Sequence, residues 1–156
     1  MKNAGKTNVA LITGISGSVL ALGVLTFFVM IPPSLARAKK KSQEGRAAVL
    51  VLNLDLASES YRADRGGYPD DAQGSGSLSR GLSQPGMKDA PYYQFRPEDL
   101  DSQGNVRNPV HPETEFVQYR NNSARLGDDS LAHNKAGVDL WCKDADGLET
   151  GLRNWE

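Results

Sequence analysis

The residues best suited to chemistry in this chain form an acidic turn, DADGLE, toward its C-terminal side. Asp144, Asp146 and Glu149 bring carboxylates together, and Gly147 permits a tight turn. A calcium ion takes about six to eight oxygen ligands, commonly several carboxylates with added carbonyls. The spacing therefore predicts a calcium loop. A solvated acidic turn fits the same residues, because Asp and Gly favour turns without any metal.

Other residue types that could catalyse a reaction lack partners in the sequence. His111 and His133 lie in polar segments without a second metal-ligand motif, so we expect surface histidines. Cys142 is the single cysteine, and we expect a partly buried thiol at a strand end. The sequence contains no glycine-rich phosphate loop and no nucleophile elbow. We therefore predict that the protein is not an enzyme, and its net charge of −1 excludes a general nucleic-acid binder.

An apolar run from Val9 to Ile31 contains no Asp, Glu, Lys, Arg or His. As a helix it would rise about 34 Å, against about 30 Å of bilayer hydrocarbon, so it predicts a transmembrane helix. Gly14 and Ser18 are spaced for close helix packing, although ordinary transmembrane composition explains them equally. A secretory signal cleaved after Ala38 is an alternative, but the run is longer than such signals usually are.

A long helix is expected to continue beyond this run. Pro32 and Pro33 predict a kink, since proline removes a helical hydrogen bond. Beyond them an apolar face recurs with helical spacing, and Gly66-Gly67 is a strong stop signal. The helix is therefore expected over about residues 9–65, with its second half packed on a sheet or a neighbouring subunit.

The pattern changes after the helix, where the sequence becomes rich in turns. Segments 92–95, 116–119 and 138–141 are short strand candidates, separated by turn signals. Trp141 and Trp155 are expected in the core of this small domain. The predicted fold class is α+β, with a long kinked N-terminal helix packed on a small antiparallel sheet.

Two segments resemble the major pseudopilin of type II secretion systems, a type IV pilin-like family. The first is YRADRGGYPDDAQG, which begins at Tyr61 and matches a Tyr-Arg-x-Asp-x-Gly-x-Tyr-Pro pattern. Its matching residues are Tyr61, Arg62, Asp64, Gly66, Tyr68 and Pro69. The second is VDLWCKDADGLETGLRNWE, which resembles the family's ending. Its matching residues are Val138 to Trp141, Asp146, Gly147, Asn154 and Trp155.

The resemblance implies a pilin-like subunit that assembles through its N-terminal helix into a pseudopilus or pilus-like filament. The implied parts are a cytoplasmic leader at 1–8, a transmembrane helix at 9–31, an extracytoplasmic half-helix at 32–65 and a small domain at 66–156. Implied partners are further copies of the chain, other pseudopilins, an inner-membrane assembly platform and the lipid bilayer. The family keeps its N-terminus cytoplasmic and its domain outside, whereas a plain count of Lys and Arg would place the domain in the cytoplasm.

The resemblance also implies Ca²⁺ in the acidic turn. Asp146 lies at a matching aspartate, Glu149 stands in for a family aspartate that this chain lacks, and Asp139 is a weaker candidate ligand. The N-terminus departs from the family pattern, because it has neither a Gly-Phe cleavage site nor a glutamate at the fifth mature position. Measured back from Pro32, processing would fall between Ala10 and Leu11. This departure favours an alternative function, a non-polymerising, membrane-anchored binding module with a pilin-like domain.

Overall fold

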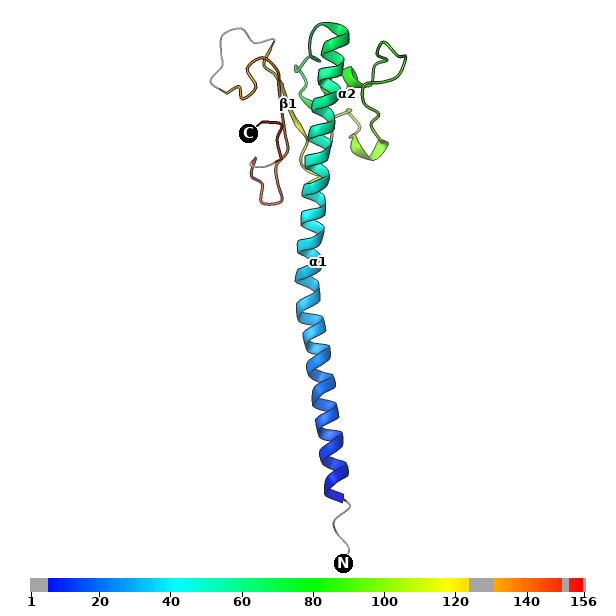
Figure 1. Ribbon diagram of the computed structural model, residues 1–156, viewed down its shortest axis with the longest axis vertical. Helices are drawn as coiled ribbons and strands as arrows, with labels where there is room; N and C mark the ends of the chain where they lie inside the picture. The colour runs from blue at the N-terminus through cyan, green and yellow to red at the C-terminus, as the bar shows by residue number, and fades with distance from the viewer. Residues whose placement is uncertain (1–5, 124–130, 150–151, 156) are drawn as a thin grey trace, which may run out of the picture. The chain divides into compact units, whose positions relative to one another are not determined.

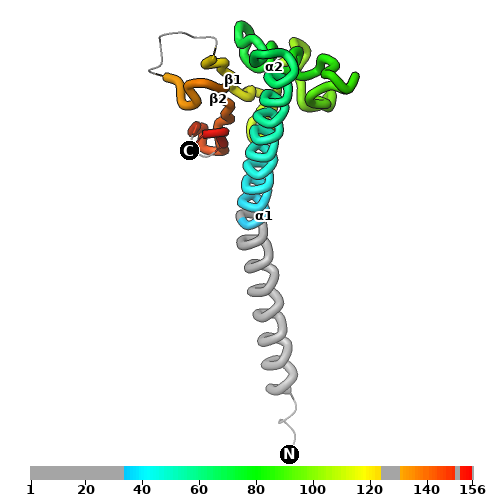
Figure 2. Tube along the Cα trace, turned by 45° about the horizontal axis from the view of Figure 1, so that its top comes forward, coloured from blue at the N-terminus to red at the C-terminus, as the bar shows by residue number. Residues whose placement is uncertain are grey.

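The computed structural model describes residues 6–123, 131–149 and 152–155, with the side chains of the long helix described from Ser34 onward. The chain divides into two compact units, Met1–Lys39 and Lys40–Glu156. Figure 2 colours the described part of the chain. The second unit holds the packed core and the sites discussed below, so we call it the C-terminal unit.

Helix α1 (Lys6–Arg65) supplies the central element of the C-terminal unit (Figure 1). Its inner side is apolar and buried, with Ala47, Leu54 and Ala57 exposed by no more than 5%. The helix ends where the sequence predicts, because Gly66 has a φ of 80° and its N–H bonds to the carbonyl of Arg62 at 2.8 Å. Glycine adopts this left-handed conformation without the steric penalty of a Cβ.

The predicted fold class is wrong in its membrane-spanning half. Among the helices whose side chains the structure describes, none combines the length and the apolar character that a bilayer crossing requires. The physical reason is charge, since Arg37, Lys39–Lys41, Glu44 and Arg46 interrupt α1 soon after Ser34. The run 9–31 and the expected kink lie outside the residues whose side chains are described, and the helical assignment is continuous through Pro32 and Pro33.

The sheet is smaller than the sequence predicts. Strands β1 (Gln118–Asn121) and β2 (Val138–Trp141) pair antiparallel, with Tyr119 opposite Leu140. Segment 92–95 is not a strand, and Pro91 before it makes only an isolated bridge to Pro85. A similar single bridge joins Trp141 to Arg153 and lays the last described residues beside β2.

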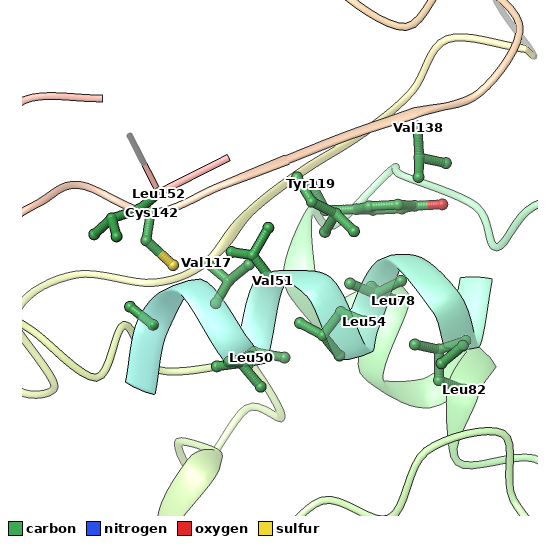
Figure 3. Packing of buried hydrophobic residues seen from close by; sticks show 14 of the residues in the cluster. Leu50, Val51, Leu54, Leu78, Leu82, Val117, Tyr119, Val138, Cys142 and Leu152 are labelled. Atoms are coloured by element: carbon green, nitrogen blue, oxygen red, sulfur yellow. The ribbon is translucent and has the colours of Figure 1, made fainter. Parts of the chain in front are cut away.

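A short helix, α2 (Ser75–Leu82), and a 3₁₀ turn, η1 (Pro97–Asp99), complete the described elements. Leu78 and Leu82 of α2 meet the inner side of α1 and the strands in one core (Figure 3). Gly81 is needed for this packing, because a Cβ there would lie 2.9 Å from the Cβ of Pro69. The residues that form the core are Ala47, Leu50, Val51, Leu54, Ala57, Leu78, Leu82, Val106, Val110, Val117, Tyr119, Val138, Leu140, Cys142 and Leu152.

Candidate functional site

The residues at the end of α1 that match the pseudopilin pattern make structural contacts with neighbouring segments rather than form a reactive site. Asp64 accepts hydrogen bonds from the Tyr92 hydroxyl at 3.0 Å and from the backbone N–H of Met87 at 3.1 Å. Tyr61 packs edge-to-face on Tyr92, with ring centroids 5.1 Å apart. Together they hold the loop that follows α2 against the last turn of α1.

Tyr68 and Pro69 fasten the chain after the helix turn. The Tyr68 hydroxyl donates to Glu59, and burial followed by this carboxylate raises the pKa of Tyr68 to about 12. The carbonyl of Pro69 accepts from the Tyr119 hydroxyl at 2.7 Å, which ties the turn to β1. The spacing Tyr-Arg-x-Asp-x-Gly-x-Tyr-Pro therefore has a structural explanation at every residue that it names apart from Arg62, whose guanidinium pairs with Glu59 at the helix surface.

The side chain of Asp144 holds the predicted calcium loop in a turn through hydrogen bonds to its backbone. Its Oδ1 accepts the backbone N–H groups of Asp146 and Leu148, each at 2.9 Å. These two bonds, the nearby Lys40 and the nearby His111 hold the pKa of Asp144 below its usual value. Gly147 has a φ of 78°, as the sequence predicts for a tight turn. The arrangement is an Asx turn, in which one carboxylate oxygen accepts two backbone N–H groups.

The other predicted ligands point to different partners. Both carboxylate oxygens of Asp146 lie 2.8 Å from Lys40 Nζ. Asp139 is buried, and its carboxylate accepts the backbone N–H groups of His133 and Asn134 at 3.0 and 2.8 Å. Glu149 is exposed. Within the part of the chain that the structure describes, no group of three or more His, Cys, Asp or Glu residues could hold a metal ion.

The aromatic residues near the C-terminal side stack on one another. Trp155 lies parallel to the His133 ring at 4.3 Å between centroids and edge-on to Trp141 at 5.6 Å. Both tryptophans are half-buried rather than central to the core. Cys142 is fully buried, and burial raises its pKa to about 12, so its thiol is not a nucleophile at neutral pH.

The outer side of α1 carries a second apolar surface that has no partner within the described chain. Residues at alternating intervals of three and four lie on this side, and all are exposed. We call them the outer stripe: Ser42, Gly45, Val49, Leu52 and Leu56. Val49, Leu52 and Leu56 are each exposed by 57–58%. The same spacing continues back in the sequence to Ala38 and Leu35. Such a repeat of 3.5 residues is typical of helix–helix seams.

Gly45 is unexplained by the packing of the chain itself. A Cβ at this position would meet no atom within 4 Å, and its φ is not in the left-handed region. Glycine in a helix interior is less favourable than alanine by roughly 0.5–1 kcal/mol. Within the described chain, the missing side chain of Gly45 makes room for no other residue. It would make room for another molecule that packs against the outer side of α1.

A groove of about 1010 Å³ runs along one flank of the outer stripe. Ser42, Gly45 and Val49 line its helix side, and Tyr93 and Pro112 line the opposite side. Arg46 also borders it. The stripe is thus continuous with a hollow that can receive the side chains of a partner.

Several predicted site residues lie outside the described side chains. They are the processing pair Ala10 and Leu11 and the proposed packing residues Gly14, Ser18, Pro32 and Pro33. Sequence reasoning missed three features of the described part: the Lys40 ion pair, the outer stripe and the contacts of Asn154, which was noted only as a match to the pseudopilin ending. The amide of Asn154 donates to Asp55 at 2.7 Å and accepts from the N–H of Leu140 at 2.9 Å. Only the stripe had a signal in the sequence, its alternating spacing opposite the core face.

No protein-family model matches this chain, and no curated protein shows significant similarity to it.

Proposed function

We propose that this chain is a pilin-like structural subunit that assembles, through helix α1, with copies of itself into a filament. The observation that carries the proposal is the outer stripe, an apolar row on the side of α1 that faces away from its own core. Contiguous exposed apolar surface of this kind marks an interaction site. The resemblance of the segment from Tyr61 to Pro69 to pseudopilins supports the same conclusion.

A second copy is the occupant that the stripe suits best. Its 3.5-residue spacing matches a second helix, and Gly45 lets the two backbones approach closely. A small partner or a disordered peptide would give no reason for a glycine at that position.

The charges beside the stripe favour a neighbour shifted along the helix axis. Lys41 and Arg46 flank its first half, whereas Asp55 and Glu59 flank its second half. Parallel copies in register would bring like charges together. A shifted copy brings unlike charges together, and a shift that repeats without closing produces a filament. An antiparallel pair would also match the charges, but it would close as a dimer.

The test is cross-linking of the full chain with a flexible bismaleimide. The double variant Ser42→Cys with Leu56→Cys places thiols at the two ends of the stripe. The matched control is Ala48→Cys with Arg62→Cys, which has the same sequence separation on exposed positions beside the stripe. Buried Cys142 stays in both.

We expect a ladder of products from the stripe variant and monomer from the control, with filaments in electron micrographs of the untreated protein. Dimers without a ladder would indicate the antiparallel pair and contradict a filament. Monomer alone in both variants would contradict assembly through this face and favour the non-polymerising binding module.

A further inference from the structure

We propose that Lys40 is the cation of the acidic turn 144–149. Its ammonium group, in place of a bound divalent metal, fastens this turn to helix α1. The inference does not depend on filament assembly, because it concerns contacts within a single chain.

In the ion pair between Lys40 and Asp146, the ammonium group contacts both carboxylate oxygens. Lys40 Nζ lies 2.8 Å from Oδ1 and 2.8 Å from Oδ2 of Asp146. The two residues are 106 positions apart in the sequence, so the contact fixes the tip of a distant loop onto the helix. A hydrogen bond between two ionised groups is stronger than one between neutral groups.

Three carbonyl oxygens in the turn and next to it accept hydrogen bonds from protein donors. The Asp144 carbonyl accepts from His111 Nε2 at 2.7 Å, and the Lys143 carbonyl accepts from Asn108 Nδ2 at 2.8 Å. The Leu148 carbonyl accepts the N–H of Asp144 at 2.8 Å. A calcium ion that used these three carbonyls among its about six to eight oxygens would compete with their protein donors.

The electrostatics also oppose a divalent ion. Lys143, the residue preceding the turn, pairs with Glu115 at 3.0 Å. A metal at Asp146 would face the Lys40 ammonium at close range, and like charges there repel. The sequence supplies, in its own side chains, the positive charge that the acidic turn requires.

The test is hydrogen–deuterium exchange of the full chain, followed in peptides that cover residues 143–149. Lys40→Met removes the ammonium and keeps the aliphatic stem. Lys39→Met is the matched control, because Lys39 is the adjacent exposed lysine. Lys40→Arg keeps the positive charge, and Asp146→Asn removes its partner. Each protein is measured in EDTA and in millimolar CaCl₂.

We expect Lys40→Met and Asp146→Asn to raise exchange in this segment about two- to fivefold, which corresponds to an exposed ion pair. Lys39→Met should leave it unchanged, and Lys40→Arg should restore most of the protection. Calcium should not alter the wild-type exchange, whereas about 0.5 M KCl should raise it by screening.

Two results would overturn the inference. One is protection of residues 143–149 by CaCl₂ in the wild type, which would restore the calcium site. The other is equal exchange in Lys40→Met and Lys39→Met. Neither result bears on filament assembly, which the cross-linking ladder reports separately.

Discussion

The two sides of α1 in the C-terminal unit are both apolar, yet only one is covered. On the inner side Leu54 is fully buried against α2 and the strands (Figure 3), while Leu56, two residues on, is 58% exposed. A helix that belonged only to a small globular domain would show polar residues on its outer side. The inner side therefore serves folding, and the outer side is the surface through which we propose that copies of the chain assemble.

Truncating one leucine on each side of α1 tests whether only the inner side contributes to stability. Leu54→Ala should lower the free energy of unfolding by about 2–5 kcal/mol, because it leaves a cavity in the core. Leu56→Ala should change it by less than about 0.5 kcal/mol. Denaturant unfolding of dilute protein measures both. Equal losses would mean that the outer side is buried in the isolated chain.

A smaller loss of stability is expected from a substitution at Asn154, which ties the last described residues to α1 and β2. Asn154→Ala should destabilise the fold by about 1–3 kcal/mol, since it leaves Asp55 and the N–H of Leu140 without this partner. Asn53→Ala removes an exposed amide from the other side of the helix and serves as the control, within about 0.5 kcal/mol. Thermal unfolding followed by circular dichroism distinguishes the two variants.

Gly45→Ala should have opposite effects on the stability of the fold and on filament assembly. We expect it to raise the free energy of unfolding by roughly 0.5–1 kcal/mol, because alanine is the better helix former and meets no atom within 4 Å. The same methyl group should weaken filament formation, as measured by sedimentation. Ala48→Leu adds bulk beside the stripe and should leave sedimentation unchanged. A stabilised variant that still sediments like wild type would remove the argument for close helix approach.

The smallest effect concerns alkaline pH. The pKa of Tyr68 is raised to about 12 in the folded chain, so the unfolded chain loses this proton first, near pH 10. Its contribution to stability is therefore complete below about pH 10 and decreases as pH rises toward 12. Tyr68→Phe should show a shallower loss of stability over that range, measured by urea unfolding at stepped pH. An unchanged slope would place the titration elsewhere, for instance at Tyr119, whose pKa burial also raises.

The sequence correctly predicted those elements whose formation depends on residues close together in the chain. The stop at Gly66 follows from glycine, the inner face of α1 from helical spacing, and strand 138–141 from a short segment with Val and Trp; the structure confirms each. Segment 92–95 looked like a strand because it is aromatic. Its rings are instead used for packing, Tyr92 on Tyr61 and Tyr93 on Phe95, so its backbone does not need a sheet.

The candidate sites were harder to predict because their contacts are distant in sequence. The acidic turn was visible as a cluster of carboxylates, but the lysine that pairs with Asp146 lies on α1, and no local pattern links the two. Asp139 looked like a fourth carboxylate and proved to cap the segment around His133 and Asn134. The membrane-spanning prediction concerned a run of residues before Ser34, and the part of α1 whose side chains are described has no segment long and apolar enough to cross a bilayer.

Asn154 has a consequence for how the protein is made. It joins Asp55 across 99 positions, so this contact forms only after nearly the whole C-terminal unit has left the ribosome. Until then α1 offers apolar residues on both of its sides at once. We expect nascent chains to need protection by a chaperone during this interval, and a stalled chain that stops short of residue 154 to be a favoured substrate for proteolysis.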